Sequence, residues 1–187
     1  DNNVYGYMID GIEMFGFPYS TGDDVRSSPA VADLDKNNIM ELIVGSHDGS
    51  LSILSGFGNQ VATHQVNGSI NGSPAAVDLD QDGDLEVVFT SFNGNSGDVH
   101  AIHHDGSTFY GFPVYLNEKM IGGAAAGDLD GDGYPEIVVC TDDDNVYAIK
   151  KDGSIMPGFP FTSTDRFFNA PTPVSYTHLR AHETRTH

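Results

Sequence analysis

One acidic pattern occurs three times in the sequence, and each copy leads directly into a run of branched apolar residues. The copies begin at Asp33, Asp78 and Asp128, so they are spaced by 45 and 50 residues. Each copy has an acidic or amide side chain at its first, third and fifth positions and a glutamate at its ninth. A repeat of this length predicts an array of similar structural units, such as a solenoid or a propeller.

A second motif, D-G-x4-G-F-P, recurs out of phase with the first. It occupies residues 10–18, 105–113 and 152–160, and a shortened version lies at residues 55–61. Turn residues divide each repeat into four short segments. Four short strands in each unit predict the blade of a β-propeller, and the absence of a sustained helical period disfavours a helical solenoid.

We therefore expect an all-β fold, a partial β-propeller of four-stranded antiparallel blades that makes about half of a ring. The rest of the propeller is expected to be missing from this chain. The expected parts are the end of a blade at 1–24, whole blades at 25–66, 67–118 and 119–165, and the first strand of another blade at 166–174.

Residues 175–187 break the repeat. Ser175 stands where the pattern requires aspartate, and the segment contains three His and two Arg but no Asp or Gly. We interpret it as a non-native tail that resembles the read-through of a sequencing adapter. A metal site of His178, His182 and His187 is disfavoured because composition and register change together.

The net charge of −19 comes from 27 acidic and 8 basic residues. Such a surface attracts cations and disfavours nucleic acid as a partner. No apolar run approaches the roughly 20 residues of a membrane helix, so we expect no membrane insertion of this segment. Cys140 is the only cysteine, which excludes an intrachain disulfide, and its apolar neighbours predict a buried thiol.

The three acidic turns have the ligands of a calcium site. We call them loop A (33–41), loop B (78–86) and loop C (128–136). Alternate side chains can converge on one point, and the backbone carbonyl of the seventh position can add an oxygen. All-oxygen ligands favour Ca²⁺ over Zn²⁺, and flexible coordination favours it over Mg²⁺. The candidate ligands are Asp33, Asp35, Asn37, Ile39 and Glu41; Asp78, Asp80, Asp82, Asp84 and Glu86; and Asp128, Asp130, Asp132, Tyr134 and Glu136.

The sixth position of each loop must turn sharply. Gly83 and Gly133 suit positive φ, and Asn38 of loop A is the next most tolerant residue. An EF-hand is excluded because it needs a glutamate at its twelfth position, where these loops have apolar strand residues. About three ions are expected, and their main role is structural, because each would neutralise crowded carboxylates and join two strands.

The three copies resemble the FG-GAP/VCBS repeats of integrin α-subunit-like propellers. The residues that carry the resemblance are SPAVADLDKNNIMELIVG, GSPAAVDLDQDGDLEVVF and IGGAAAGDLDGDGYPEIVV, and it spans residues 1–174. In that family the loop between the first two strands of a blade binds Ca²⁺, which implies sites in loops A, B and C. Loop A departs from the pattern at Asn37 and Asn38. The resemblance also implies a secreted or cell-surface bacterial protein.

Three other motifs offer alternative sites. DGSLS at 48–52 matches a metal-dependent adhesion motif, but its neighbours predict a hairpin turn. His100 and His104 would share one strand face, where a solvated surface is favoured over a metal pair. NGS at Asn67 and Asn71 fits either a glycosylation acceptor or an ordinary loop, and we favour the loop.

The sequence contains no G-x-S-x-G, H-E-x-x-H or phosphate-loop motif. The favoured function is a non-catalytic, calcium-binding scaffold for binding or adhesion in a larger extracellular protein, with a protein or carbohydrate ligand that is not identified. The alternative is the propeller part of an extracellular polysaccharide lyase. An intracellular signalling propeller conflicts with loops that need abundant calcium.

Overall fold

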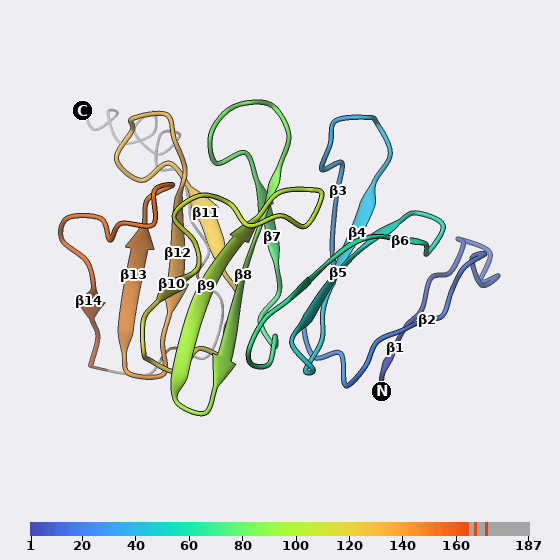
Figure 1. Ribbon diagram of the computed structural model, residues 1–187, viewed down its shortest axis with the longest axis horizontal. Helices are drawn as coiled ribbons and strands as arrows, with labels where there is room; N and C mark the ends of the chain where they lie inside the picture. Colours follow the sequence, from blue (N-terminus) through green and yellow to red (C-terminus); the bar gives the residue numbers. More distant parts are fainter. Residues whose placement is uncertain (165–166, 168–170, 172–187) are drawn as a thin grey trace, which may run out of the picture.

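The computed structural model describes residues 1–164, 167 and 171, which form fourteen strands and no helix (Figure 1). Apart from Phe167 and Pro171, the segments expected at 166–174 and 175–187 lie outside the described residues. Within the described part, no helix that could cross a membrane is found.

Three antiparallel sheets of four strands follow one another along the chain, preceded by a two-stranded sheet. The two-stranded sheet pairs β1 (Asn3–Val4) with β2 (Tyr19–Ser20). The next sheet contains β3 (Ala30–Ala32), β4 (Glu41–Gly45), β5 (Ser50–Ser55) and β6 (Gln60–Gln65). The middle sheet contains β7 (Ala75–Val77), β8 (Glu86–Asn93), β9 (Ser96–Ile102) and β10 (Val114–Tyr115). The last contains β11 (Ala125–Gly127), β12 (Glu136–Cys140), β13 (Asn145–Ile149) and β14 (Phe161–Thr162).

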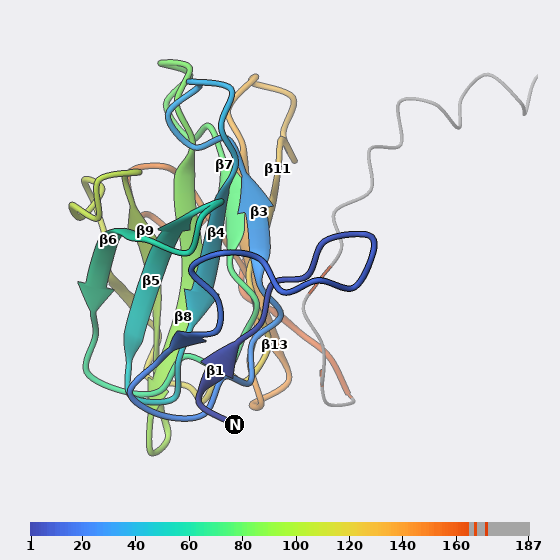
Figure 2. The same cartoon turned by 90° about the vertical axis from the view of Figure 1, so that its right-hand side faces the viewer.

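The four-stranded sheets stand side by side in an open, fan-shaped array, which is called the fan below. Within each, the strand order follows the chain order, so every connection is a hairpin. Figure 2 shows the first strands β3, β7 and β11 close together on one side, with β6 and β9 on the other. The sheets do not close into a ring within the described residues. The expected all-β, partial propeller is therefore confirmed, whereas the blade boundaries drawn from the repeats stay a prediction.

The first strands are short and made of small residues because neighbouring sheets approach one another there. A Cβ atom added to Gly123, just before β11, would collide with the backbone carbonyl of Ser73, which precedes β7. The second strands β4, β8 and β12 are rich in valine and isoleucine and largely buried. These branched residues suit strands that are covered on both faces.

Two apolar cores lie between successive sheets. Along β8 the side chains alternate, so that Val87 and Phe89 join the core shared with β3–β6, and Val88 joins the core shared with β11–β14. Both faces of the middle sheet are therefore packed. This arrangement fixes the ends of the strands, from which the acidic loops project.

The prediction of a solvated surface around His100 is wrong. Only 7% of His100 is exposed, and its ring stacks on Phe89 with the centroids 4.8 Å apart. Its Nε2 atom lies 2.9 Å from Ser91 Oγ. Burial is the main cause that lowers the pKa of His100 to about 4, with a contribution from His64. The ring is neutral at physiological pH and belongs to the core.

The other predictions about single motifs agree with the structure. Cys140 is buried. The DGSLS segment begins in the turn between β4 and β5, where Asp48 Oδ1 accepts a hydrogen bond from the Ser50 backbone N–H at 2.9 Å. Asn67 and Asn71 lie in the loop between β6 and β7.

Candidate metal centres

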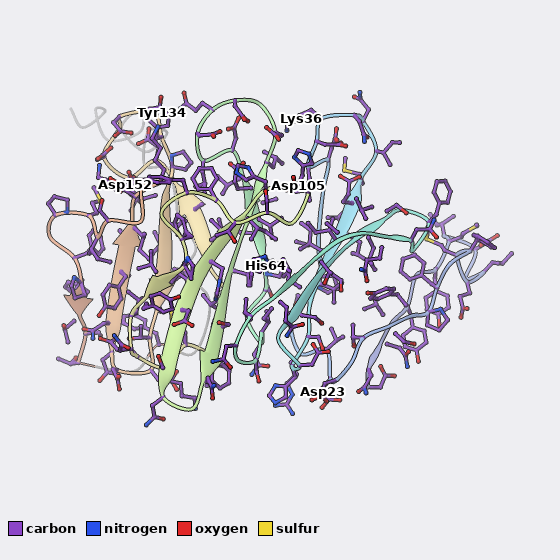
Figure 3. The ribbon with its side chains drawn as sticks, in the orientation of Figure 1. Asp23, Lys36, His64, Asp105, Tyr134 and Asp152 are labelled. Carbon is purple, nitrogen blue, oxygen red and sulfur yellow. The ribbon has the colours of Figure 1, made fainter. Side chains whose placement is uncertain are left out.

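Each acidic loop joins the first strand of a four-stranded sheet to the second. Loop A follows β3, loop B follows β7 and loop C follows β11. All three project from the same end of the fan, as the places of Lys36 and Tyr134 at the top of Figure 3 illustrate. Because the hairpin repeats in register, the loops present the same side-chain positions three times.

In each loop, the carboxylates of the first, third and ninth positions converge. One ligand oxygen from each residue lies within 4.8 Å of the others. Oxygens bound at about 2.3–2.6 Å around one Ca²⁺ ion can be up to about 5 Å apart, so the separation fits a shared ion. These three groups, called the triads below, are Asp33, Asp35 and Glu41; Asp78, Asp80 and Glu86; and Asp128, Asp130 and Glu136.

The glutamate of each triad is buried and held by the same hydrogen bond. Because it begins the second strand, its Oε2 atom accepts the backbone N–H of the leucine at the second position of the loop. The donors are Leu34, Leu79 and Leu129, at 2.9, 2.8 and 2.9 Å. The exposed fractions of Glu41, Glu86 and Glu136 are 7%, 0% and 2%, so three carboxylates are buried where uncompensated charge is costly.

The side chains at the fifth position shape the turn. Asn37, Asp82 and Asp132 each accept a hydrogen bond through Oδ1 from the backbone N–H two residues later. Neither Asp82 nor Asp132 belongs to a triad. Their role as ligands stays a prediction, as does that of Asn37 and of the backbone carbonyls of Ile39, Asp84 and Tyr134.

The sixth position has positive φ in every loop, as predicted: 69° at Asn38, 108° at Gly83 and 96° at Gly133. The fourth position is also left-handed, which was not predicted from the sequence. Its residues are Lys36, Gln81 and Gly131. These backbone bends turn each loop tightly enough to bring its alternate side chains together.

Two triad oxygens are buried without a hydrogen-bond partner: Asp33 Oδ1 and Glu86 Oε1. Burial raises the pKa of Glu86 above its ordinary value, and the nearby charge of Asp80 adds to the rise. An unpartnered buried carboxylate oxygen is costly, and a cation held by the triad would compensate it. The residues present therefore fit a hard divalent cation.

A different group faces each triad glutamate from the third strand or the residue after it. Ser55 pairs with Glu41 in strand register. His103 has its Nδ1 atom 3.3 Å from Glu86 Oε1. Lys150 has its Nζ atom 3.9 Å from Glu136 Oε1. These residues were not predicted from the sequence, although their equivalent place in the repeat could have identified them.

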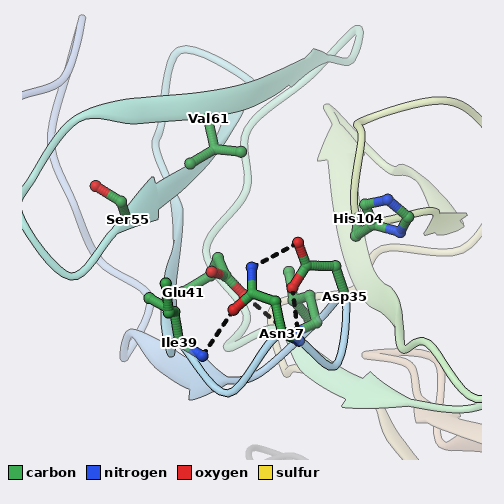
Figure 4. Close-up of a pocket in the computed structure, with 8 residues that line it drawn as sticks. Asp35, Asn37, Ile39, Glu41, Ser55, Val61 and His104 are labelled. Atoms are coloured by element: carbon green, nitrogen blue, oxygen red, sulfur yellow. Dashed lines mark hydrogen bonds between the residues drawn. The ribbon is translucent and has the colours of Figure 1, made fainter.

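Loop A lies beside a cavity of about 190 Å³ between the first two four-stranded sheets (Figure 4). Val61 of β6 lines it from one side, and His104, in the turn after β9, lines it from another. Inside loop A, the Asn37 side-chain amide donates to Asp35 Oδ2 at 2.8 Å. The asparagine thus contributes a neutral group where loops B and C have a carboxylate.

Neighbouring loops also contact one another. The Leu85 backbone N–H of loop B donates to the Leu34 carbonyl of loop A at 2.7 Å. The side-chain amide of Gln81 in loop B donates to the Gly133 carbonyl of loop C. The three candidate centres therefore form one continuous row.

The profile of the FG-GAP-like repeat family matches residues 78–139, from the first aspartate of loop B almost to the end of β12. This stretch is therefore similar to an FG-GAP-like repeat. It includes the whole of loops B and C and therefore two of the three triads. No curated protein matches the chain.

Two solved β-propeller structures resemble the fold. BamB from Moraxella catarrhalis has a TM-score of 0.57 and 15% identity, over 82% of this chain and 41% of that one. BBS1N, solved in complex with ARL6DN, has a TM-score of 0.61 and 14% identity, over 88% of this chain and 48% of that one. The chain thus spans less than half the length of these proteins, and the similarity establishes the propeller fold alone.

Proposed function

We propose that this chain is a calcium-binding propeller segment with FG-GAP-like repeats, and that it serves as a non-catalytic scaffold for binding or adhesion. The observation that carries the proposal is the threefold recurrence of the triads, each with its buried glutamate held by the same backbone hydrogen bond. A solvated acidic turn has no need of a buried carboxylate.

Calcium is the ion that these groups suit best. Their ligand atoms are oxygens, which Ca²⁺ prefers, and two of these buried oxygens have no hydrogen-bond partner. The ion would cancel the repulsion within a triad and hold the first strand of a sheet to the second. Carboxylates kept ionised in this way are poor general acids, which supports a structural role over a catalytic one.

We infer an extracellular location, because calcium loops of this kind need an environment rich in Ca²⁺ and FG-GAP-like repeats are typical of extracellular proteins. The proposed setting is a larger secreted or cell-surface bacterial protein. The partner would be a protein or a carbohydrate, bound by the complete propeller.

Calorimetric titration of the chelator-stripped chain with CaCl₂ tests the proposal. We expect about three saturable binding events with dissociation constants between about 1 µM and 1 mM. Asp80→Asn should remove one event, because Asp80 belongs to the triad of loop B.

Asp105→Asn is the matched control. Asp105 Oδ1 accepts hydrogen bonds from the Ser107 backbone N–H and hydroxyl, at 2.9 and 2.6 Å, in an acidic turn that has no triad. This variant should bind as much calcium as the parent chain. Equal loss in both variants, or no binding by the parent chain, would contradict the proposal.

A further inference from the structure

We propose that Lys150 is an internal cation for loop C, whose ammonium group competes with calcium for the same carboxylates. Loop C is then a weaker calcium site than loop B. The strands that loop C connects, β11 and β12, stay joined when calcium is absent. The inference rests on the calcium binding proposed above and adds a residue that differentiates the three sites.

The Lys150 ammonium lies against three carboxylates of loop C. Nζ donates to Asp130 Oδ2 at 2.8 Å. It also lies 3.9 Å from Asp132 Oδ2 and 3.9 Å from Glu136 Oε1. Asp130 and Glu136 are two of the three members of the triad. A calcium ion bound there would repel the neighbouring ammonium, so binding must break this contact.

The position of Lys150 has equivalents in the other sheets. Glu136 and Lys150 directly precede and follow the register pair Ile137 and Ile149 of β12 and β13. At the corresponding place, loop A has the neutral hydroxyl of Ser55 and loop B has the imidazole of His103. Among the three loops, a lysine faces the triad in loop C alone.

The backbone of Lys150 is fixed while its side chain can move. Its backbone N–H donates to the Ser154 carbonyl at 2.8 Å, in the tight turn after β13. The side chain is partly exposed and has a flexible four-carbon stem. The ammonium group can therefore leave the carboxylates without rearrangement of the sheet.

The Lys150 ammonium and the Asp130 carboxylate form an ion pair, with Nζ 2.8 Å from Oδ2. Asp130 and Lys150 thus form a pair that calcium must separate before it can use the aspartate.

Lys151 provides a matched control on the same turn. Its Nζ atom lies 3.3 Å from the centroid of the Tyr134 ring, and it forms no ion pair with a described carboxylate within 4.0 Å. A change at Lys151 removes the same charge from the neighbourhood of loop C but leaves the Asp130 contact in place.

Calorimetric calcium titrations of the parent chain, Lys150→Met and Lys151→Met test the proposal. Methionine keeps the length of the apolar stem and removes the charge. In Lys150→Met we expect the affinity of one site to rise about tenfold, since calcium no longer displaces a charge-assisted hydrogen bond. Adding Asp130→Asn should abolish that event, and Lys151→Met should bind like the parent chain.

The outcomes separate the two proposals. If the parent chain binds calcium but Lys150→Met gives the same isotherm, the role of Lys150 is wrong and the proposed function stands. If no variant binds calcium, both proposals fail. A rise in Lys151→Met equal to that in Lys150→Met would mean that overall charge, and not the contact with Asp130, determines the affinity.

A second measurement uses the unmodified chain and covers the case in which Lys150→Met does not fold. Lysine acylation by a hydroxysuccinimide ester is followed by mass spectrometry, with Lys151 as the internal reference. Saturating calcium should raise the labelling of Lys150 relative to Lys151 at least threefold, because the ammonium leaves the carboxylates. An unchanged ratio would overturn the proposal.

Discussion

Glu86 is the group through which the charge of loop B can be removed with least disturbance to the packing. Its side chain is fully buried, and it shares a triad with Asp78 and Asp80 in which the oxygens lie within 4.8 Å. Glutamine has the same shape and can still accept the Leu79 N–H through its carbonyl oxygen. Glu86→Gln therefore removes one charge and retains the Leu79 hydrogen bond, while His103 Nδ1, 3.3 Å from Oε1, loses a carboxylate neighbour.

The magnitude of the effect follows from the triad. Two unit charges 4.8 Å apart repel by roughly 3 kcal/mol at an effective dielectric of 20, and solvent at the partly exposed aspartates reduces this. In a chelator, Glu86→Gln should thus be as stable as the parent chain or up to about 2 kcal/mol more stable. In calcium at 100 times the dissociation constant, it should lack the roughly 2.7 kcal/mol that one occupied site contributes.

Urea unfolding followed by circular dichroism measures the free energy of unfolding of each variant in calcium and in chelator. The matched control is Glu118→Gln. The Glu118 carboxylate accepts hydrogen bonds from Thr141, Asn145 and Tyr147, away from the acidic loops. This control should lose the same stability in both buffers. If Glu86→Gln also loses the same stability in calcium and in chelator, Glu86 is only a buried hydrogen-bonding group. That result would refute its role in calcium binding.

Two further predictions concern buried polar groups that lie outside the acidic loops. The pKa of His100 falls from 6.5 to about 4 on folding, so this residue contributes stability above pH 6.5 that is lost as the pH falls toward 4. In chelator, His100→Gln should reduce the loss of unfolding free energy between pH 7 and pH 5 by about 2 kcal/mol; an unchanged pH dependence would refute this. Burial and the neighbouring Glu118 carboxylate raise the pKa of Tyr147 to about 12. The Tyr147 hydroxyl donates a hydrogen bond to Glu118 at 2.6 Å. Tyr147→Phe should cost about 1.5–3 kcal/mol by urea unfolding, equally with and without calcium, and a loss confined to calcium buffer would contradict this.

The acidic loops were predictable from the sequence because their ligands lie within nine residues of one another. A glutamate that begins the second strand must face the turn that precedes it, so Glu41, Glu86 and Glu136 could be assigned from spacing alone. The left-handed backbone at Asn38 and Gly83 followed from residue type in the same way.

The groups that face the triads from the third strand, or from the residue after it, were not predictable from the spacing within the loops. Lys150 reaches loop C through the pairing of β13 with β12, and this register depends on the turn between them. The burial of His100 was missed for a related reason. The middle sheet is packed on both faces, so six of the seven residues of β9 are buried or partly buried. Side chains on both faces of this strand are therefore shielded from solvent, and the usual pattern of alternating buried and exposed residues is absent.

The central claim is that each triad holds a calcium ion between the first two strands of its sheet. Diffraction from crystals soaked in saturating calcium, with anomalous differences measured, tests it most directly. The account predicts one peak in each loop, within about 2.3–2.6 Å of the triad oxygens. Well-ordered loops without any peak would contradict it.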